Sequence, residues 1–188
     1  MAHNDLAIIF LQQAGGARFM SALHRLFEHD PRLETLTLEE RGLLFKTWAE
    51  RGDGAELART VEKHPEWLTD AWRGVAKYHA TQNDFRKAYE ITRRYGGTPA
   101  LPSVSEGVSI DELRQSLHAS PDNYGIGFQL YHAQMQQRQV DEALMTVRHF
   151  TALPGPPRYF HFLEAEAWAE KQDWERAWNA RKKFDDAQ

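Results

Sequence analysis

The sequence predicts an all-α protein built from antiparallel helix hairpins. Its eight prolines fall in five clusters, and the stretches between them are rich in Ala, Leu, Glu, Arg and Gln. Because proline ends helices and disfavours the helical conformation of the residue before it, each cluster predicts a boundary between helical blocks. Alternating runs of β-branched residues are almost absent, so no sheet is predicted.

A repeated phrase indicates that these blocks are related to one another. The chain reads WAERGD at residues 48–53 and WAEKQD at residues 168–173. Each proline-free window also has a polar break near its middle, which predicts one helix hairpin per window. These breaks lie at residues 14–16, 51–53, 82–84, 138–139 and 171–173. Residues 139 and 173, in the last two breaks, are 34 positions apart.

The residues flanking these breaks resemble the tetratricopeptide repeat (TPR) family, whose unit of about 34 residues pairs two antiparallel helices. The best match has large and small apolar residues in its first helix and one small residue in its second: Trp72, Val75, Ala76, His79 and Ala88. The last repeat follows with Ala165, Trp168, Trp174, Ala177 and Phe184, and a weaker copy has Leu130, Val140, Ala143, Val147 and Phe150. The resemblance implies a right-handed superhelix of about 10–11 helices.

Two windows depart from the repeat pattern. In the repeat around Trp48, the small position at the helix crossing falls on Leu57, or on Ala58 if the turn at residues 52–54 is one residue longer. The opening window, residues 4–30, is predicted as a hairpin mainly from its Gly-Gly break and the proline that follows it.

The breaks at residues 84 and 139 are 55 positions apart, about 21 more than one 34-residue repeat, and the extra residues fall between residues 96 and 123. This stretch predicts a loop followed by a helix that begins with Ser109 and Glu112 as a capping box and ends before Pro121. We therefore expect an N-terminal block at residues 1–95, a loop at 96–108 and a C-terminal block at 109–188. The C-terminal block would hold the extra helix and two hairpins, and a single continuous stack is the alternative.

Composition excludes several classes of function. The net charge of −4 argues against a nucleic-acid-binding protein, and the absence of Cys excludes disulfides and thiolate chemistry. The early apolar run at residues 6–11 has no preceding Lys or Arg, so it makes a poor signal peptide. No stretch approaches the ~20 apolar residues of a membrane span. We expect a cytoplasmic protein, with the periplasm as the alternative.

No residue pattern predicts catalysis, a cofactor or a metal. None of the nine His forms an HExxH motif, and the nearest approach to a metal-ligand pair is His161 with Glu164. No phosphate-binding glycine loop and no nucleophile motif occurs. We therefore expect a protein that is not an enzyme.

The resemblance to TPR proteins implies a concave groove that holds a peptide or a helix of a partner protein. By that resemblance the groove-facing residues are cationic at one end and largely aromatic at the other: Lys46, Arg73, Lys77, Phe128, His132, Met135, Tyr159 and Phe162. Some family members clamp a terminal carboxylate with Lys, Arg and two Asn, but this chain has no Asn at the matching positions.

The last predicted helix carries more aromatic surface than one face can bury. It holds Trp174, Trp178 and Phe184, and no polar capping helix follows it. We therefore expect this end to be covered by a second subunit or by residues of a longer protein, with Trp174 and Trp178 as the contact. Homodimerisation is thus the alternative to a heterologous partner.

Overall fold

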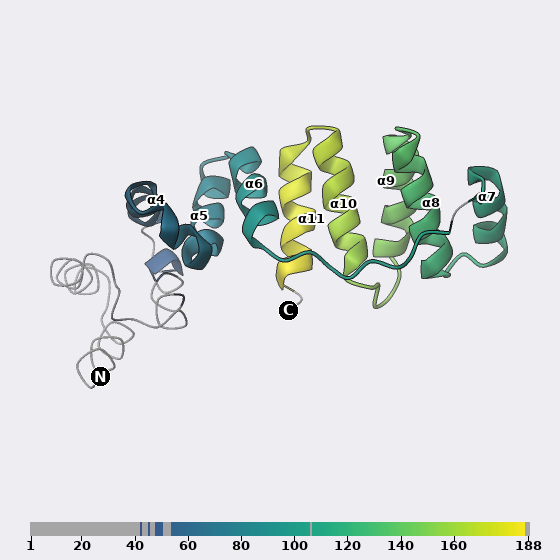
Figure 1. Cartoon of the computed structure of the whole chain (residues 1–188), viewed down its shortest axis with the longest axis horizontal. Helices are drawn as coiled ribbons and strands as arrows, with labels where there is room; N and C mark the ends of the chain where they lie inside the picture. The colour runs from purple at the N-terminus through teal and green to yellow at the C-terminus, as the bar shows by residue number, and fades with distance from the viewer. Residues whose placement is uncertain (1–41, 43–44, 46–47, 51–53, 106, 187–188) are drawn as a thin grey trace. The chain divides into compact units, whose positions relative to one another are not determined.

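The computed structural model describes residues 42, 45, 48–50, 54–105 and 107–186. Across these residues the regular secondary structure is entirely helical, with no strand, which confirms the predicted all-α fold of helix hairpins (Figure 1). The predicted opening hairpin and Lys46 lie outside the described residues.

The chain divides into two compact units, residues 1–82 and 83–188. The sequence placed the boundary near residue 95 instead. The difference concerns one helix, α6 (Phe85–Tyr95), which packs on the C-terminal helix and so belongs to the second unit. We describe each unit by itself.

The described part of unit 1 centres on two helices that pack against each other, α4 (Gly54–Lys63) and α5 (Leu68–Thr81), joined by the 3-10 helix η1 (Pro65–Trp67). Both candidates for the small crossing position, Leu57 and Ala58, are buried. Leu57 packs against Gly74 of α5, because a Cβ atom on Gly74 would lie 2.7 Å from its Cδ2 and also 2.7 Å from the Cβ of Ala49. The missing side chain of Gly74 therefore provides the space that Leu57 and Ala49 fill.

Unit 2 contains α6, α7 (Ile110–Ala119), α8 (Tyr124–Gln136), α9 (Val140–Thr151), α10 (Tyr159–Glu170) and α11 (Trp174–Asp186). Each packs on the next from α7 to α11, and α6 then packs on α11. The spatial order is therefore α7, α8, α9, α10, α11, α6 (Figure 1). Residues 96–105 and 107–109, which we call the connecting segment, run back along this row from the end of α6 to the start of α7.

Three tight turns share one backbone conformation. Asn83, Arg138 and Gln172 have φ of 60°, 59° and 58°. Each lies two residues before the first residue of the second helix of a hairpin, which is α6, α9 or α11. At two of these turns an aspartate caps the helix that follows: Asp84 accepts from the Lys87 amide at 3.2 Å and Asp173 from the Arg176 amide at 3.1 Å. The equivalence of the breaks near residues 84, 139 and 173 is thus confirmed.

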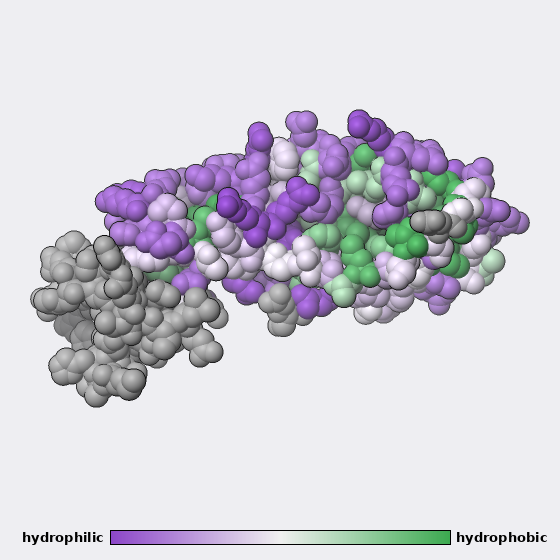
Figure 2. Space-filling model, viewed as in Figure 1, coloured by the Kyte–Doolittle hydropathy of each residue, from purple (hydrophilic) through white to green (hydrophobic). Residues whose placement is uncertain are grey.

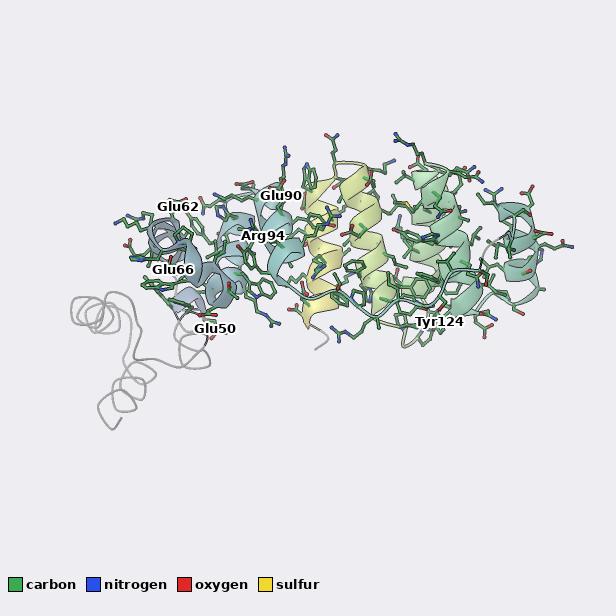
Figure 3. All side chains as sticks on the ribbon, in the orientation of Figure 1. Glu50, Glu62, Glu66, Glu90, Arg94 and Tyr124 are labelled. Carbon is green, nitrogen blue, oxygen red and sulfur yellow. The ribbon has the colours of Figure 1, made fainter. Side chains whose placement is uncertain are left out.

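The main core of unit 2 lies where α8, α9 and α10 meet. The rings of Phe150 and Phe160 are stacked with their centroids 4.8 Å apart. Tyr124, labelled in Figure 3 at the start of α8, lies 5.5 Å from the first ring and 5.7 Å from the second. Gly127 makes this packing possible, because a side chain there would overlap the ring of Phe150.

The extra helix, α7, begins as the sequence predicts. Ser109 accepts from the Glu112 amide at 3.2 Å, and the Glu112 carboxylate accepts from the Ser109 amide at 2.8 Å, which completes the capping box. Ile110 and Leu113 then pack on Leu130 of α8. The helix therefore covers the end of the row opposite α6.

Candidate functional site

Five of the residues predicted to line the groove lie on the first helices of the two hairpins in unit 2, and four of these five are partly exposed. We call the surface formed by His132, Met135, Tyr159 and Phe162 the first-helix face. All four side chains are half-buried, and the last three pack against the main core. The face therefore offers partly exposed apolar surface on a rigid support.

Phe128 does not belong to this face as an accessible residue. It is only 2% exposed and is part of the main core, with its ring 5.9 Å from that of Tyr159 and 6.2 Å from that of His132. The assignment of Phe128 to an open groove is corrected: its ring supports the residues that remain accessible.

Two of the three predicted cations are described, and both belong to unit 1. Arg73 and Lys77 are exposed and lie four residues apart on α5, so they share one face of that helix. The guanidinium of Arg73 lies over the ring of Trp72, 5.0 Å from its centroid. Because Lys46 is outside the described residues, the predicted cluster of three cations stays a prediction.

A buried arginine fixes the start of the connecting segment to α11. Arg181 is 0% exposed, and its Nη2 donates to the carbonyl oxygens of Gly96 at 2.6 Å and Gly97 at 2.7 Å. Its Nε donates to the carboxylate of Asp185 at 3.1 Å, and its guanidinium lies over the rings of Phe162 and Phe184. One side chain thus ties a backbone segment to the first-helix face and to the end of α11.

The connecting segment then lies against the start of α10. Residues 97–100 line a shallow pocket of about 290 Å³ together with Arg158, Tyr159 and Phe184. Further along, Leu101, Val104 and Val108 are 46%, 42% and 41% exposed. Figure 2 shows hydrophobic surface gathered over the half of unit 2 that holds α8 and α9, whereas the half with α6 and α11 is mostly hydrophilic.

Glu166 joins α6 to α10. Its carboxylate accepts a hydrogen bond from the Tyr89 hydroxyl at 2.6 Å and pairs with Arg93 at 3.1 Å. Burial, together with this hydrogen bond and the charge of Glu166, raises the pKa of Tyr89 above its ordinary value. The tyrosine therefore stays a neutral donor.

The C-terminal aromatic residues are partly covered by the same chain. Trp174 is half-buried, with its ring 6.0 Å from that of Tyr89 and the guanidinium of Arg86 over it at 5.5 Å. Trp178 is also half-buried. Helix α6 thus covers part of Trp174, which the sequence assigned to a second subunit or to residues of a longer protein. The predicted contact of Trp178 with such a partner stays a prediction.

Three basic residues were not among the candidates that the sequence predicted: Arg148, Arg181 and Lys183. A signal for Arg181 was available, since it lies 34 residues after the buried Val147 and so occupies a core position of the repeat. The other two lie in a pocket between α9, α10 and α11, described below.

The described residues show neither a metal-binding cluster nor a membrane span. In the described part of the chain, no three His, Asp or Glu side chains are placed to hold a metal ion, so His161 and Glu164 gain no third partner of that kind there. Among the same residues, no helix is long and apolar enough to span a bilayer.

Comparison with known proteins adds one distant likeness. No protein-family model and no curated protein matches the chain. Among solved structures, that of a mutant of a protein named MamA is similar, with 15% sequence identity and a TM-score of 0.38 over 100% of this chain and 96% of that chain.

Proposed function

We propose that the chain is a non-catalytic protein-interaction module whose first-helix face binds an extended, apolar segment of a partner protein. One observation carries this proposal: the edge of this face, at Tyr159 and at the Arg181 that lies over Phe162, already holds a segment of its own chain. The backbone of Gly96 is extended, with φ of −83° and ψ of 126°. Arg181 donates hydrogen bonds to the carbonyl oxygens of Gly96 and Gly97.

Recognition of main-chain carbonyls supplies affinity without demanding a particular sequence, while neighbouring side chains supply selectivity. The connecting segment uses the surface near Arg158 and Tyr159. His132 and Met135 lie toward the C-terminal end of α8 and do not line this pocket, so they are available to a partner. Their half-buried side chains rest on packed neighbours, so little further side-chain entropy is lost when they are covered.

In unit 1, the exposed Arg73 and Lys77 suit acidic residues of the same or another partner. Charged contacts of this kind mainly speed and orient association. The contribution of unit 1 to the affinity for a partner is therefore expected to weaken as the salt concentration rises. Binding at the first-helix face is expected to persist.

Self-assembly is the second candidate, and the exposed Leu101, Val104 and Val108 favour it. A second copy could cover these side chains. Light scattering of the purified chain over a range of concentrations separates a homodimer from a monomer that awaits another protein.

A matched pair of methionine variants tests the proposed function. Met135→Glu places a charge on the first-helix face, whereas Met145→Glu places it on α9, where Met145 is 66% exposed. In quantitative affinity capture from the native host, a specific partner should be retained by the wild type and Met145→Glu and lost by Met135→Glu. Identical protein sets for all three chains would contradict the assignment of the face, provided that circular dichroism reports equal folding.

A further inference from the structure

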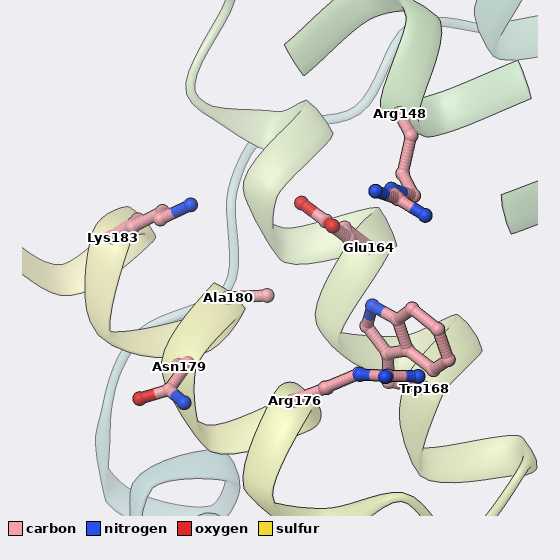
Figure 4. Close-up of a pocket in the computed structure, with 7 residues that line it drawn as sticks. All are labelled: Arg148, Glu164, Trp168, Arg176, Asn179, Ala180 and Lys183. Carbon is pink, nitrogen blue, oxygen red and sulfur yellow. The ribbon is translucent and has the colours of Figure 1, made fainter. Parts of the chain in front are cut away.

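Unit 2 has a concave surface on the opposite side of α10 from the first-helix face. The pocket has a volume of about 260 Å³, and its lining comes from three helices (Figure 4): Arg148, Glu164, Trp168, Arg176, Asn179, Ala180 and Lys183. Glu164 and Trp168 are one turn apart on α10, whereas Phe162 lies two residues before Glu164 and so points to the other side. The second helices α9 and α11 flank this pocket.

The pocket is basic although the protein is acidic. Three cations and one carboxylate line it, which gives a formal charge of +2, while the whole chain carries −4. Concave basic surface concentrates the field and attracts anions. This local reversal of charge distinguishes the pocket from an ordinary solvated helix face.

The three cations of the pocket differ in their partners. Arg176 pairs with Asp173 at 3.3 Å and lies over the ring of Trp168 at 4.7 Å. Neither Arg148 nor Lys183, by contrast, forms an ion pair with any residue that the structure describes. Figure 4 shows the carboxylate of Glu164 between them, one cation on each side.

The shape limits what can enter. A volume of about 260 Å³ lies just below the range of ~300–1,000 Å³ that is usual for small-molecule sites. It is large enough for one or two side chains of a peptide. Trp168 provides an aromatic wall, and the amide of Asn179 provides a neutral hydrogen-bonding group.

We infer that this pocket binds an acidic side chain, Asp or Glu, of a protein segment that docks across α9 and α11. The ligand's carboxylate would lie beside that of Glu164 and contact Arg148 and Lys183, so that two carboxylates would face the three cations of the pocket. The neighbouring part of the segment would lie on the side chain of Arg176, which itself covers the ring of Trp168. This inference does not depend on the first-helix face, since the two surfaces share no residue.

The test uses the full chain and a fluorescein-labelled peptide of alternating Glu and Leu, with the Gln–Leu peptide as its uncharged match. Fluorescence anisotropy should report binding of the Glu peptide and at least tenfold weaker binding of the Gln peptide. Arg148→Gln combined with Lys183→Gln should weaken binding of the Glu peptide by about tenfold or more.

Two substitutions that remove the same total charge as the pocket variant serve as controls. Lys182→Gln is adjacent to Lys183 on α11 but outside the pocket, and Arg138→Gln lies in a turn where Gln172 has the same conformation elsewhere in the chain. The combined control should change the affinity by less than about twofold. Met135→Glu should likewise leave it unchanged, so that failure of this pocket and failure of the first-helix face are distinguishable.

Several results would overturn the inference. The first is that the wild type does not bind the Glu peptide. The second is that the control variant loses as much affinity for the Glu peptide as the pocket variant does, and the third is that the wild type binds the Gln peptide as tightly as the Glu peptide. A phosphoserine peptide that binds far more tightly, and is displaced by inorganic phosphate, would assign the pocket to phosphate groups instead of carboxylates. Thermal melts followed by circular dichroism establish that each exposed-residue variant is folded.

Discussion

The side chain of Arg181 donates a hydrogen bond of 2.6 Å to the carbonyl oxygen of Gly96, 85 residues earlier in the chain. This bond links the end of α11 to the end of α6, and the carboxylate of Asp185 shares the same guanidinium. A buried arginine in a helix array is costly unless its charge is paired. Here the pairing fixes the path of the connecting segment.

Arg181→Met should therefore destabilise the protein by about 3–5 kcal/mol, because it removes the carbonyl contacts and leaves the buried Asp185 without this partner. Urea denaturation measures the change. Arg181→Met/Asp185→Leu should lose less stability than the single variant, since no buried charge then remains at this pair. A single variant as stable as the wild type would show that the arginine contacts contribute nothing.

The packing of α6 on α11 can be tested through Tyr89. Tyr89→Phe removes the hydroxyl that donates to Glu166 and should cost roughly 1–2 kcal/mol. Tyr95→Phe, at the end of the same helix, is the matched control and should be nearly neutral. Equal effects at the two positions in chemical denaturation would contradict the position of α6.

Gly127 should resist even the smallest enlargement. Gly127→Ala places a methyl group against the ring of Phe150, and overpacking of this kind costs about 1–3 kcal/mol although alanine is the better helix former. Phe150→Leu shrinks the opposing side chain. The double variant should therefore be more stable than the sum of the two single effects allows, whereas strict additivity in thermal unfolding would place the two residues apart.

His161 provides a pH-dependent readout near the basic pocket. Burial lowers its pKa below the ordinary value of 6.5, Glu164 acts to raise it, and Lys183 lowers it further. NMR titration should thus give a lower pKa in Glu164→Gln and a higher one in Lys183→Gln.

The direction in which stability changes with pH follows from the same lowered pKa of His161. The neutral imidazole is favoured in the folded state, so the unfolded chain binds more protons at pH values between the two pKa values. The contribution of His161 is present above about pH 6.5 and is lost as the pH falls through its folded pKa. In His161→Gln, the loss of stability on acidification should be smaller. An equal loss would mean that His161 does not titrate differently on folding.

The sequence predicted the helices and their turns because these depend on local features. Proline positions, the capping side chains of Ser109, Asp84 and Asp173, and the 34-residue spacing are all visible in the linear chain. The helix that covers α11 was not predictable in this way. The apolar residues of α6 indicate that one face is buried, but not which helix buries it.

The candidate sites depend still more on distant parts of the chain. Phe128 was expected at an open surface from its place in the repeat, but its ring packs into the core. The basic pocket combines side chains from three helices, and each cation alone looks like ordinary helix surface. Only the arrangement of α9, α10 and α11 shows that they converge.

Photocrosslinking from the first-helix face tests the proposed function most directly. A benzophenone amino acid in place of Met135 should, in the native host, form an adduct with one protein identified by mass spectrometry. The same amino acid in place of Gln115, an exposed residue of α7, should form no such adduct. Absence of an adduct at Met135, or the same adducts at both positions, would contradict the proposal that this face binds a partner.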